Sequence, residues 1–459
     1  MTTTAPQMPG SVPLLKNLYA MRSAPLAALT RGFRTCGDVM KVEFPGVSGH
    51  MLFHPEHVRS LLVDHAKHIS KDTPGFEKLR LLLGNGLLTS DGDFWLRQRR
   101  IAQPAFHRTR IFALGASMVD QTDKTVMEWT LASKVGEPVD VADAMMRLTL
   151  RIVCDTMLGI DVDADAADVG RAVTFLLHDI NERIVRPWVL PPYVPTARNQ
   201  RFVASGTRVQ QVIQRAVTQK RADMNAPGAD FLRMLMEARD EETGEGMTDQ
   251  QLQDELATVF AAGHETTANL LAWTFAWLSR TPHVRRKLVA ELDAVLGDRA
   301  VTAEDYPKLP YTRMVLAEAL RISPPVWLLS RRLKQPLTVG KYTLPVNSMA
   351  FVSPYVTHRH PGFWRDPEGF DPERFAEGAD KDRPTFAYFP FGGGPRKCIG
   401  DTFALVEATL VLATLARKFE LELPIGQSPD PEPVITLRPR GGLPMHVRER
   451  VAPKPAPLS

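Results

Sequence analysis

A long apolar segment with a polar interruption constrains the fold of this chain more than any other feature. Its start, Thr248-Asp-Gln-Gln251, has the pattern of a helix capping box, and Pro282 marks its end. The helix between them would be about 45–50 Å long, at about 1.5 Å per residue. Residues 256–278 are almost all apolar. A helix that is apolar on most faces is buried, so this one is expected to run through the protein interior.

Four polar residues interrupt the apolar segment near its middle. They read His264-Glu-Thr-Thr267 and directly follow Gly263. Buried polar groups are costly unless they are paired. A membrane span does not fit this run, one solvent-facing stripe does not accommodate four consecutive positions, and a zinc-protease helix would need histidine where Ala268 stands. We therefore expect the helix to open locally at this point, beside a reaction centre.

A second feature is the stretch Phe391-Gly-Gly-Gly-Pro-Arg-Lys-Cys-Ile-Gly400. Three glycines and a proline cannot form a regular helix or strand, so the stretch must be a tight loop. It presents Cys398 just ahead of an apolar run at helical spacing over residues 402–419. Backbone N–H groups and the positive end of the helix dipole favour the thiolate there. The residues alone leave open whether Cys398 is a nucleophile, a ligand of a metal or haem iron, or an ordinary buried thiol.

Composition limits the class of protein. The chain has 459 residues, of which 44% are hydrophobic and 24% charged, and its formal net charge is +4. These values are typical of a globular protein with a large core and give no sign of nucleic-acid binding. The three cysteines, at positions 36, 154 and 398, are too few and too scattered for a disulfide framework or a four-cysteine zinc site. We therefore expect a reducing compartment and, by default, the cytoplasm.

The ends of the chain carry no recognisable targeting signal. The N-terminal residues lack a positively charged region followed by an apolar core, and no apolar run there approaches the length of a membrane span. We expect no signal peptide, no membrane anchor, and flexible ends over about residues 1–15 and 451–459. No linker divides the chain convincingly, which favours one domain over residues 1–459.

The coarse pattern of elements is mainly helical with small β-sheets. Helical spacing dominates residues 79–236 and 248–334, and the proline-rich segment 186–195, with Trp188 and Tyr193, interrupts it as a loop over a cavity. Residues 363–375 have the composition of a loop. Strand patterns at residues 39–44 and 50–53 predict a short hairpin, residues 337–351 fit two strands with a turn, and short strand patterns lie within residues 421–447.

Two further pairs of residues have helical spacing. Glu318 and Arg321 lie at i and i+3, and Arg374 is a candidate third partner. Such a pair is most often a surface ion pair of little value. Trp95 and Arg99 lie at i and i+4, where an indole N–H beside a guanidinium suits an anionic group such as a carboxylate. On its own, this second pair fits a solvated basic face equally well.

Taken in order, these motifs resemble the cytochrome P-450 family of haem-thiolate monooxygenases. The order is Trp-x-x-x-Arg, Ala-Gly-x-Glu-Thr-Thr, Glu-x-x-Arg, Pro-Glu-Arg-Phe and Phe-x-x-Gly-x-Arg-x-Cys-x-Gly, over about residues 86–447. The cysteine motif is highly specific, and no signature position departs from the family pattern. The resemblance implies a mainly α, single-domain fold with a helix-rich core around a haem b group and a minor β-rich lobe.

The resemblance also implies roles for individual residues. Cys398 would be the axial thiolate of the haem iron, with N–H groups around Gly400 tempering its charge and Phe391 packed beside it. Side chains suited to carboxylates would hold the haem propionates, namely Trp95, Arg99, Arg331 and Arg396. A structural triad behind the cysteine loop would consist of Glu318, Arg321 and Arg374.

On the long helix, the resemblance assigns the polar run to oxygen and proton handling. Ala262 and Gly263 would line an oxygen groove. Thr266 would hydrogen-bond the bound oxygen, and Glu265 would help to bring protons into an otherwise dry site. The enzyme would insert one oxygen atom of O2 into its substrate, by hydroxylation or epoxidation.

The substrate implied by this resemblance is a hydrophobic or amphipathic small molecule such as a fatty acid, terpenoid, steroid or polyketide. Mainly apolar stretches at 74–83, 175–184, 259–262, 326–328 and 434–436 occupy the substrate-contacting positions of the family. The candidate pocket residues within them are Phe76, Val259, Val326, Trp327 and Ile435.

Electrons would come from a separate partner, because the residues after Cys398 leave no room for a fused reductase. We expect a ferredoxin or flavodoxin with its NAD(P)H reductase. An acidic partner would dock on a basic face near the thiolate. The members of that predicted face are Arg97, Arg100, Arg108, Arg110 and Lys397.

Three other interpretations stay open at this level. One keeps the haem but uses peroxide or isomerises its substrate, although Glu265 and Thr266 argue against it. Another is a haem-binding sensor or carrier without monooxygenase turnover. The third makes Cys398 a hydrolase nucleophile, but no histidine lies near the loop in sequence.

Overall fold

The computed structural model describes residues 4–7, 19–44, 47–162, 166–186, 188–224, 230–240 and 242–450. Most of the predicted flexible ends therefore lie outside the described residues. The α-helices are α2 (Pro25–Cys36), α3 (Pro55–Arg59), α4 (Pro74–Leu83), α5 (Gly92–Ala102), α6 (Arg108–Ala113), α7 (Gly115–Val135), α8 (Val141–Val153), α9 (Ala166–Val185), α10 (Ala197–Ala222), α11 (Asp230–Glu237), α12 (Asp249–Arg280), α13 (Pro282–Leu296), α14 (Pro310–Ile322), α15 (Pro354–Thr357) and α16 (Asp401–Lys418). None of the helices in these ranges has the length and apolar character of a membrane span.

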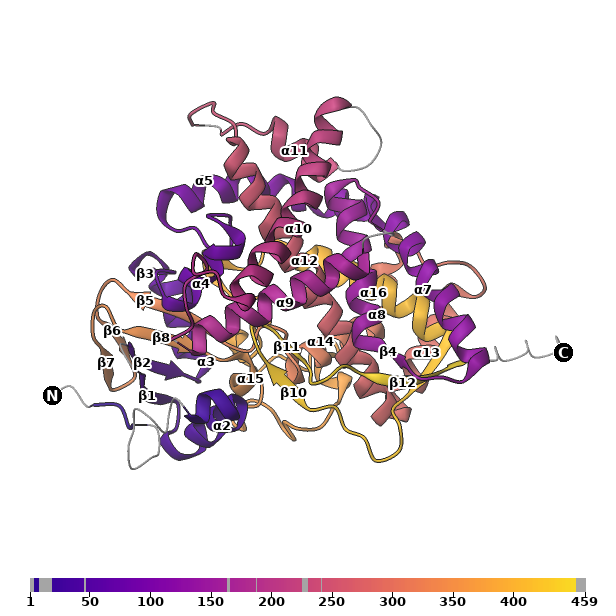
Figure 1. Ribbon diagram of the computed structural model, residues 1–459. Coiled ribbons are helices and arrows are strands. Elements are labelled where there is room, and N and C mark those ends of the chain that lie inside the picture. The colour runs from indigo at the N-terminus through magenta and orange to yellow at the C-terminus, as the bar shows by residue number, and fades with distance from the viewer. Residues whose placement is uncertain are drawn as a thin grey trace.

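The strands are short and gather in small sheets, so the prediction of a mainly helical fold with minor sheet is confirmed (Figure 1). They are β1 (Val39–Phe44), β2 (Val47–Leu52), β3 (Ile69–Ser70), β4 (Val139–Asp140), β5 (Leu329–Leu333), β6 (Leu337–Val339), β7 (Tyr342–Leu344), β8 (Met349–Val352), β9 (Phe419–Glu422), β10 (Pro431–Pro433), β11 (Leu437–Pro439) and β12 (Pro444–Glu449).

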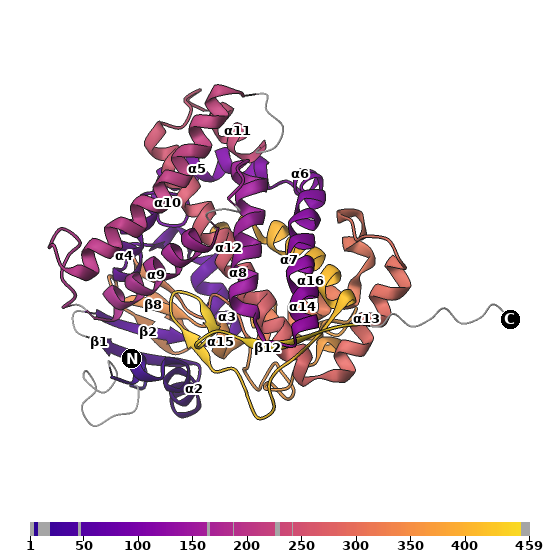
Figure 2. The same ribbon diagram turned by 45° about the vertical axis from the view of Figure 1, so that its right-hand side comes forward.

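The long predicted helix is α12, which runs through the middle of the helical part of the protein (Figures 1 and 2). It begins at the predicted capping box, where the Thr248 hydroxyl accepts from the Gln251 N–H and the Gln251 side chain accepts from the Thr248 N–H. It ends at Arg280, just before Pro282. Its 32 residues span about 48 Å. The neighbours that bury it are α8, α10, α14 and α16.

The polar run does not open this helix, so the predicted local opening at Gly263 is wrong. Residues 249–280 form one continuous α-helix. The hydroxyls of Thr266 and Thr267 donate to the carbonyls four residues earlier, at 2.8 and 3.3 Å. Thr149 of α8 donates to the carbonyl of His264 at 2.9 Å. These bonds satisfy polar groups within the helix and across to its neighbour, which removes the reason for a break.

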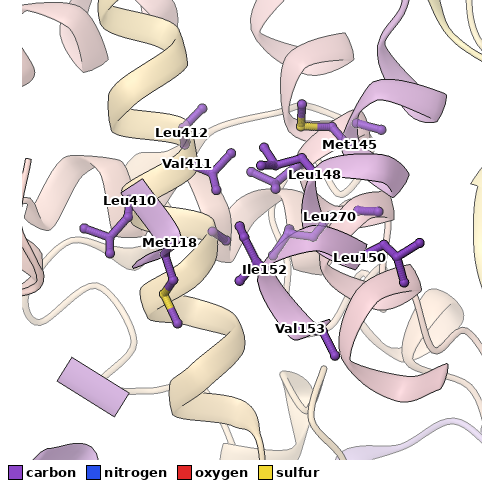
Figure 3. Close-up of a cluster of buried hydrophobic side chains, with 14 of the residues drawn as sticks. Met118, Met145, Leu148, Leu150, Ile152, Val153, Leu270, Leu410, Val411 and Leu412 are labelled. Atoms are coloured by element: carbon purple, nitrogen blue, oxygen red, sulfur yellow. The ribbon is translucent and has the colours of Figure 1, made fainter. Parts of the chain in front are cut away.

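Four helices meet in the main hydrophobic core (Figure 3). Met118 comes from α7, Leu148 and Ile152 from α8, Leu270 from α12 and Leu410 from α16, and all of them are buried. Large apolar side chains packed this closely leave little freedom for the helices to slide. The core therefore fixes α16, which follows the cysteine loop, against α12, which carries the polar run.

The β-rich lobe lies to one side of the helical core (Figure 1). Its main sheet has the strand order β1-β2-β8-β5-β3. The predicted early hairpin is confirmed, with Met40 opposite Met51, while the segment predicted as two strands is the hairpin β6–β7 followed by β8. At the far edge, β3 pairs with β5 so that Ser70 lies opposite Arg332. This edge brings residues near 71 and 331 next to the candidate site.

Candidate active site

The cysteine loop folds as tightly as its glycines and proline predict. A short 3-10 helix covers Gly394–Arg396, the Cys398 N–H donates to the Phe391 carbonyl at 2.9 Å, and α16 begins directly after Gly400. Gly394 has a φ of +65°, and a Cβ there would lie 2.0 Å from the carbonyl oxygen of Leu62. No side chain fits at that position, so glycine is required for the loop to pass this close to another backbone segment.

The thiol of Cys398 keeps exposed surface, although the protein around it removes most of its hydration. This desolvation raises the pKa of Cys398, while the N–H of Gly400 and the charges of Arg99 and Lys397 lower it. The predicted stabilisation by N–H groups is therefore present but is outweighed by burial. A cation bound at the sulfur would make the thiolate the stable form.

Three of the predicted propionate residues gather around the loop. The guanidinium carbon of Arg396 lies 3.6 Å from the centre of the Trp95 ring. Arg396 also donates to the Ser90 carbonyl at 2.9 Å and forms an ion pair with Asp91. Arg99, one turn after Trp95 on α5, donates to the carbonyl of Lys397 at 2.9 Å. The structure thus brings α5 and the cysteine loop together through side chains that suit a carboxylate.

Arg331 is the fourth predicted propionate residue. It is buried, and no acidic side chain of the described residues pairs with it. Within the described residues its guanidinium makes one hydrogen bond, to the carbonyl of Ser330 at 2.7 Å, and its Nε has no partner. Burial and, to a smaller extent, the charge of Arg396 lower the pKa of Arg331 to about 10, and the charge of Asp91 opposes them. The same region holds Lys71, which no sequence motif indicated and which is also buried. These two cations define the deepest part of the cluster.

On α12, the predicted oxygen-groove residues share one accessible patch inside the helical body. Ala262 is exposed and Gly263 and Thr266 are partly exposed, whereas residues 267–276 after them are buried. A Cβ on Gly263 would lie 3.0 Å from a methyl group of Val153 on α8. The small residues at these positions therefore leave space at the exposed side of α12. They also allow close packing against Val153 of α8.

Glu265 points to the loop between β10 and β11. Its Oε1 accepts from the hydroxyl of Thr436 at 2.7 Å, and Asn269 donates to the same hydroxyl oxygen at 3.1 Å. Burial raises the pKa of Glu265, while the Thr436 hydroxyl and the charge of Arg438 lower it. Thr436 belongs to one of the predicted substrate-contacting stretches, and its contact with Glu265 was not predicted. No local pattern indicated it, because 171 residues separate the two partners.

A second buried acid, Glu407 on α16, was not predicted. Neither of its carboxyl oxygens is exposed, and neither makes a hydrogen bond of good geometry in the described residues. Burial raises the pKa of Glu407 well above its ordinary value, and the side chain of Thr267 on α12 lowers it. A buried carboxyl group with a raised pKa therefore lies between the helix of the cysteine loop and the helix with the polar run.

The three predicted triad residues are brought together. Glu318 and Arg321 form a bidentate pair with two N–O distances of 2.7 Å, and neither side chain is exposed. Arg374 lies 3.4 Å from the Glu318 carboxylate and donates to the carbonyl of Asp366 at 2.7 Å. The pair is buried, so the common surface interpretation of this spacing does not apply.

The candidate pocket residues differ in where they pack and in how deeply they are buried. Val259 and Ile435 are partly buried against the main core, Val326 is also partly buried, and Phe76 is buried. Trp327 instead packs in a separate cluster of the β-rich lobe, and its indole donates to the Val434 carbonyl at 2.8 Å. The structure therefore accounts for Trp327 as a core residue.

A cavity of about 480 Å³ lies among α4, α9, α10 and α12. Leu82 and Leu176, from two of the predicted substrate-contacting stretches, contribute to its wall with apolar residues such as Phe202, and the rest of the lining includes polar side chains such as Gln210 and Asp254. The α9–α10 segment predicted as a loop over a cavity connects two of these helices. Its Trp188 is 61% exposed, so this ring does not fill the cavity.

The predicted basic face is largely neutralised. Arg100 pairs with Asp240 at 3.0 Å and with Glu242 at 2.7 Å. Arg97 pairs with Glu245, and Lys397 pairs with Asp401 at 2.7 Å. Figures 1 and 2 both show α5 and α11 at the same end of the molecule, which is why the segment after α11 reaches these arginines. Arg108 and Arg110 are exposed and form no ion pair within the described ranges.

The site fits a haem group on two observations. The buried guanidinium of Arg331 has no acidic partner in the described residues, and its unpaired Nε calls for an acceptor from outside the chain. Cys398 offers an accessible sulfur, and no group of three or more His, Cys, Asp or Glu side chains is arranged to hold a metal ion in the part of the chain that the structure covers. A haem needs one strong protein ligand at its iron.

Comparison with known proteins gives one consistent family. The cytochrome P-450 family model matches residues 6–444. Cyclooctatin synthase of Streptomyces melanosporofaciens is 36% identical over 94% of this chain and 92% of its own length. Cyclooctat-9-en-7-ol 5-monooxygenase of the same organism is 35% identical over 90% and 88%, and pentalenene oxygenase of Streptomyces avermitilis is 31% identical over 92% of each chain.

A solved structure agrees with these relatives. The heme domain of cytochrome P-450DA superposes with a TM-score of 0.90 over 98% of both chains, at 28% sequence identity. The match of the family model along nearly the whole chain and the identity to several relatives go far beyond a shared fold. The chain belongs to the cytochrome P-450 family and is a haem-thiolate monooxygenase of that family.

Proposed function

We propose that this enzyme oxygenates a cyclic terpenoid, with Cys398 as the thiolate ligand of its haem. The observation that carries the proposal is an accessible Cys398 in a loop whose surroundings hold buried cations without acids. The terpenoid follows from the relatives, which are named for cyclooctatin, cyclooctat-9-en-7-ol and pentalenene. The apolar residues in the wall of the cavity beside α12, Leu82, Leu176 and Phe202, would contact such a molecule.

The residues of the chain bind and orient the cofactor. A thiolate-ligated haem supplies the activation of O2 when it is bound. Trp95, Arg99, Arg331 and Arg396 hold its propionates through charge-assisted hydrogen bonds. The N–H of Gly400, which already lowers the pKa of Cys398, continues to stabilise negative charge on the sulfur. The Glu318–Arg321–Arg374 triad supports the segment that leads into the cysteine loop.

Glu265 and Thr266 handle protons on the other side of the site. The Glu265 Oε1 accepts from Thr436, so its own proton sits on Oε2 in the protonated form that burial favours. The Thr266 hydroxyl donates to the Ala262 carbonyl at 2.8 Å, which leaves its oxygen as an acceptor towards the accessible patch. A proton can therefore be held at Glu265 and passed to a group that Thr266 orients.

Thiolate ligation is tested by the spectrum of the reduced, carbon-monoxide-bound protein. The wild type should show the red-shifted Soret band of thiolate-ligated haem, and Cys398→Ser should lose it. The matched variants Cys36→Ser and Cys154→Ala should keep the band, because neither thiol belongs to the site. A wild-type spectrum without the band would reject the proposal.

The substrate class needs a second experiment. Terpenoid hydrocarbons and alcohols, fatty acids and steroids are screened for the low-to-high-spin shift that a bound substrate causes. Compounds that shift the spectrum are then incubated with a ferredoxin, its reductase and NAD(P)H. Oxygenated terpenoid products support the proposal. Spin shifts and products from fatty acids or steroids alone would overturn the terpenoid assignment, and binding without any product would favour a carrier or sensor.

A further inference from the structure

Lys71 lies where the β-rich lobe meets the cysteine loop. It directly follows β3, whose Ser70 is paired with Arg332 of β5. Continuing this antiparallel register by one residue sets Lys71 opposite Arg331. Only 6% of Lys71 and 5% of Arg331 is exposed. Two basic side chains therefore share one buried position, which is unfavourable unless an anion lies between them or beside them.

No acid among the described residues fills that role. The Lys71 ammonium donates to the Leu88 carbonyl at 2.7 Å, and within the described residues no carboxylate reaches salt-bridge distance. Asp91 is the nearest candidate, but it accepts from the Lys71 main-chain N–H at 3.0 Å and forms its ion pair with Arg396. Burial lowers the pKa of Lys71 well below its usual range, and the charges of Arg331 and Arg396 lower it further.

We infer that Lys71 is a cofactor-binding residue, whose ammonium meets a carboxylate of the haem. The inference rests on the proposed function, since it needs the haem to be present. Arg396 shares its charge with Asp91, whereas Lys71 and Arg331 are buried cations that no carboxylate of the described residues pairs with, and a haem brings two propionates. The Leu88 carbonyl takes one ammonium N–H, and two remain for a propionate oxygen.

Two contacts orient the side chain of Lys71. The ring of Phe76 lies with its centre 5.2 Å from the Lys71 Nζ, close enough for a cation–π contact. The carbonyl of Leu88 and this ring leave the ammonium few other orientations. Phe76 belongs to α4, and Leu88 lies in the segment between α4 and α5, which leads into the helix of Trp95 and Arg99.

A purely structural role makes a different prediction from a cofactor-binding role. If Lys71 only binds the Leu88 carbonyl and holds β3 in place, replacing it should speed haem loss equally for haem with free propionates and for haem with esterified propionates. If the ammonium meets a propionate, the effect of its loss must depend on the charge of that propionate. Esterified haem therefore separates the two roles.

The test uses Lys71→Met and the wild type, each reconstituted with protohaem or with its dimethyl ester, and measures haem transfer to excess apomyoglobin. With protohaem, Lys71→Met should lose haem about tenfold faster, as expected for a lost charge-assisted hydrogen bond. With the dimethyl ester the two proteins should differ by less than about twofold. Lys71→Arg should restore slow loss of protohaem. Lys67→Met, at an exposed position of the same segment, is the matched control and should behave as the wild type.

An equal acceleration with both cofactors would overturn the inference and leave Lys71 a structural residue. An unchanged rate with protohaem would also overturn it. The proposed function fails separately, because a wild type without the red-shifted Soret band would show no thiolate ligation regardless of Lys71. If Lys71→Met does not fold, the comparison is made with Lys71→Gln, which keeps a donor for the Leu88 carbonyl but removes the charge.

Discussion

Arg321 uses every N–H of its guanidinium inside the protein. Two donate to Glu318 at 2.7 Å, and three donate to the carbonyls of His358, Pro367 and Gly369 at 2.7–3.0 Å. Glu318 also accepts from the Asp371 N–H at 2.9 Å. A buried ion pair is tolerated only when hydrogen bonds replace the lost water, and here they do so completely for Arg321. The pair therefore fastens α14 to the segment that precedes the cysteine loop.

The first prediction concerns this arginine. Arg321→Lys keeps the charge but offers three N–H groups in place of five, so at least two acceptors lose their partners. We expect a loss of about 3–5 kcal/mol in the free energy of unfolding and a lower haem content. Arg313→Lys, at an exposed position of the same helix, should change neither. Denaturant unfolding followed by circular dichroism measures the difference; a loss below about 1 kcal/mol would contradict the argument.

The second prediction concerns Glu255 on α12. Burial raises its pKa from 4.5 to about 7, although the Leu87 N–H donates to it at 3.0 Å. The folded protein thus keeps a proton that the unfolded chain releases, so this residue lowers stability as the pH rises from 4.5 to 7, and the full penalty persists above 7. Glu255→Gln, which mimics the protonated acid, should gain about 2–3 kcal/mol relative to the wild type between pH 4.5 and 8.

Unfolding midpoints measured across that pH range test the sign of the Glu255 effect. The exposed Glu304→Gln variant serves as the control and should run parallel to the wild type at every pH. A constant difference between Glu255→Gln and the wild type, without change between pH 4.5 and 8, would show that Glu255 has no raised pKa.

At the scale of elements, the cysteine loop depends to different degrees on its three consecutive glycines at positions 392–394. Gly392 has a φ of +72° but open space where a Cβ would lie. A Cβ on Gly393 would meet the Phe386 ring at 2.3 Å, and one on Gly394 would meet a backbone carbonyl at 2.0 Å with a φ of +65°. A ring can swing aside, whereas the backbone of Leu62 cannot.

The third prediction follows from these surroundings. Gly392→Ala should cost about 1–2 kcal/mol through backbone strain alone. Gly393→Ala should cost more, and Gly394→Ala should prevent haem incorporation or folding. The ratio of Soret to protein absorbance in freshly purified protein orders the three variants. Equal haem content in all three would mean that the loop adapts more freely than its close contacts indicate.

Sequence patterns predicted elements well where the signal is local. The capping box at Thr248 and the stop at Pro282 fixed the ends of α12, and the glycines of the cysteine motif fixed its loop. The expected opening at Gly263 failed for a physical reason: the Thr149 hydroxyl, on another helix, bonds to the carbonyl of His264. A pattern along one segment cannot reveal which side chain will arrive from a neighbouring helix.

At the scale of the whole molecule, the residues with a family motif could be named in advance, and those without one could not. Lys71 reaches Arg331 through the register of β3 and β5, and Thr436 reaches Glu265 from the loop between β10 and β11. Their importance arises from tertiary contacts, and neither has an unusual sequence neighbourhood. The same limit applies to charge, because sequence gives the number of arginines but not their partners.

The docking face for the redox partner shows this limit most directly. Arg100 is held by Asp240, whose side chain is buried, and by Glu242, while Arg97 donates to the carbonyl of Gly246 at 3.2 Å. These arginines fasten the segment after α11 to α5. They are poorly placed to attract a second protein, because each already forms an ion pair with an acidic side chain of the same chain.

The last prediction distinguishes arginines that hold the segment after α11 against α5 from arginines that bind the redox partner. Arg108→Glu with Arg110→Glu should raise the apparent Kd for an acidic ferredoxin about tenfold at low salt and flatten its salt dependence, without changing the melting temperature. Arg100→Glu should instead lower the melting temperature, because it adds a third carboxylate beside Asp240 and Glu242 and removes their counter-charge. Binding is measured by titration of the partner at several salt concentrations, with thermal melts of the same preparations. If Arg100→Glu weakened partner binding as much as the double variant while melting normally, the face predicted from the sequence would be restored.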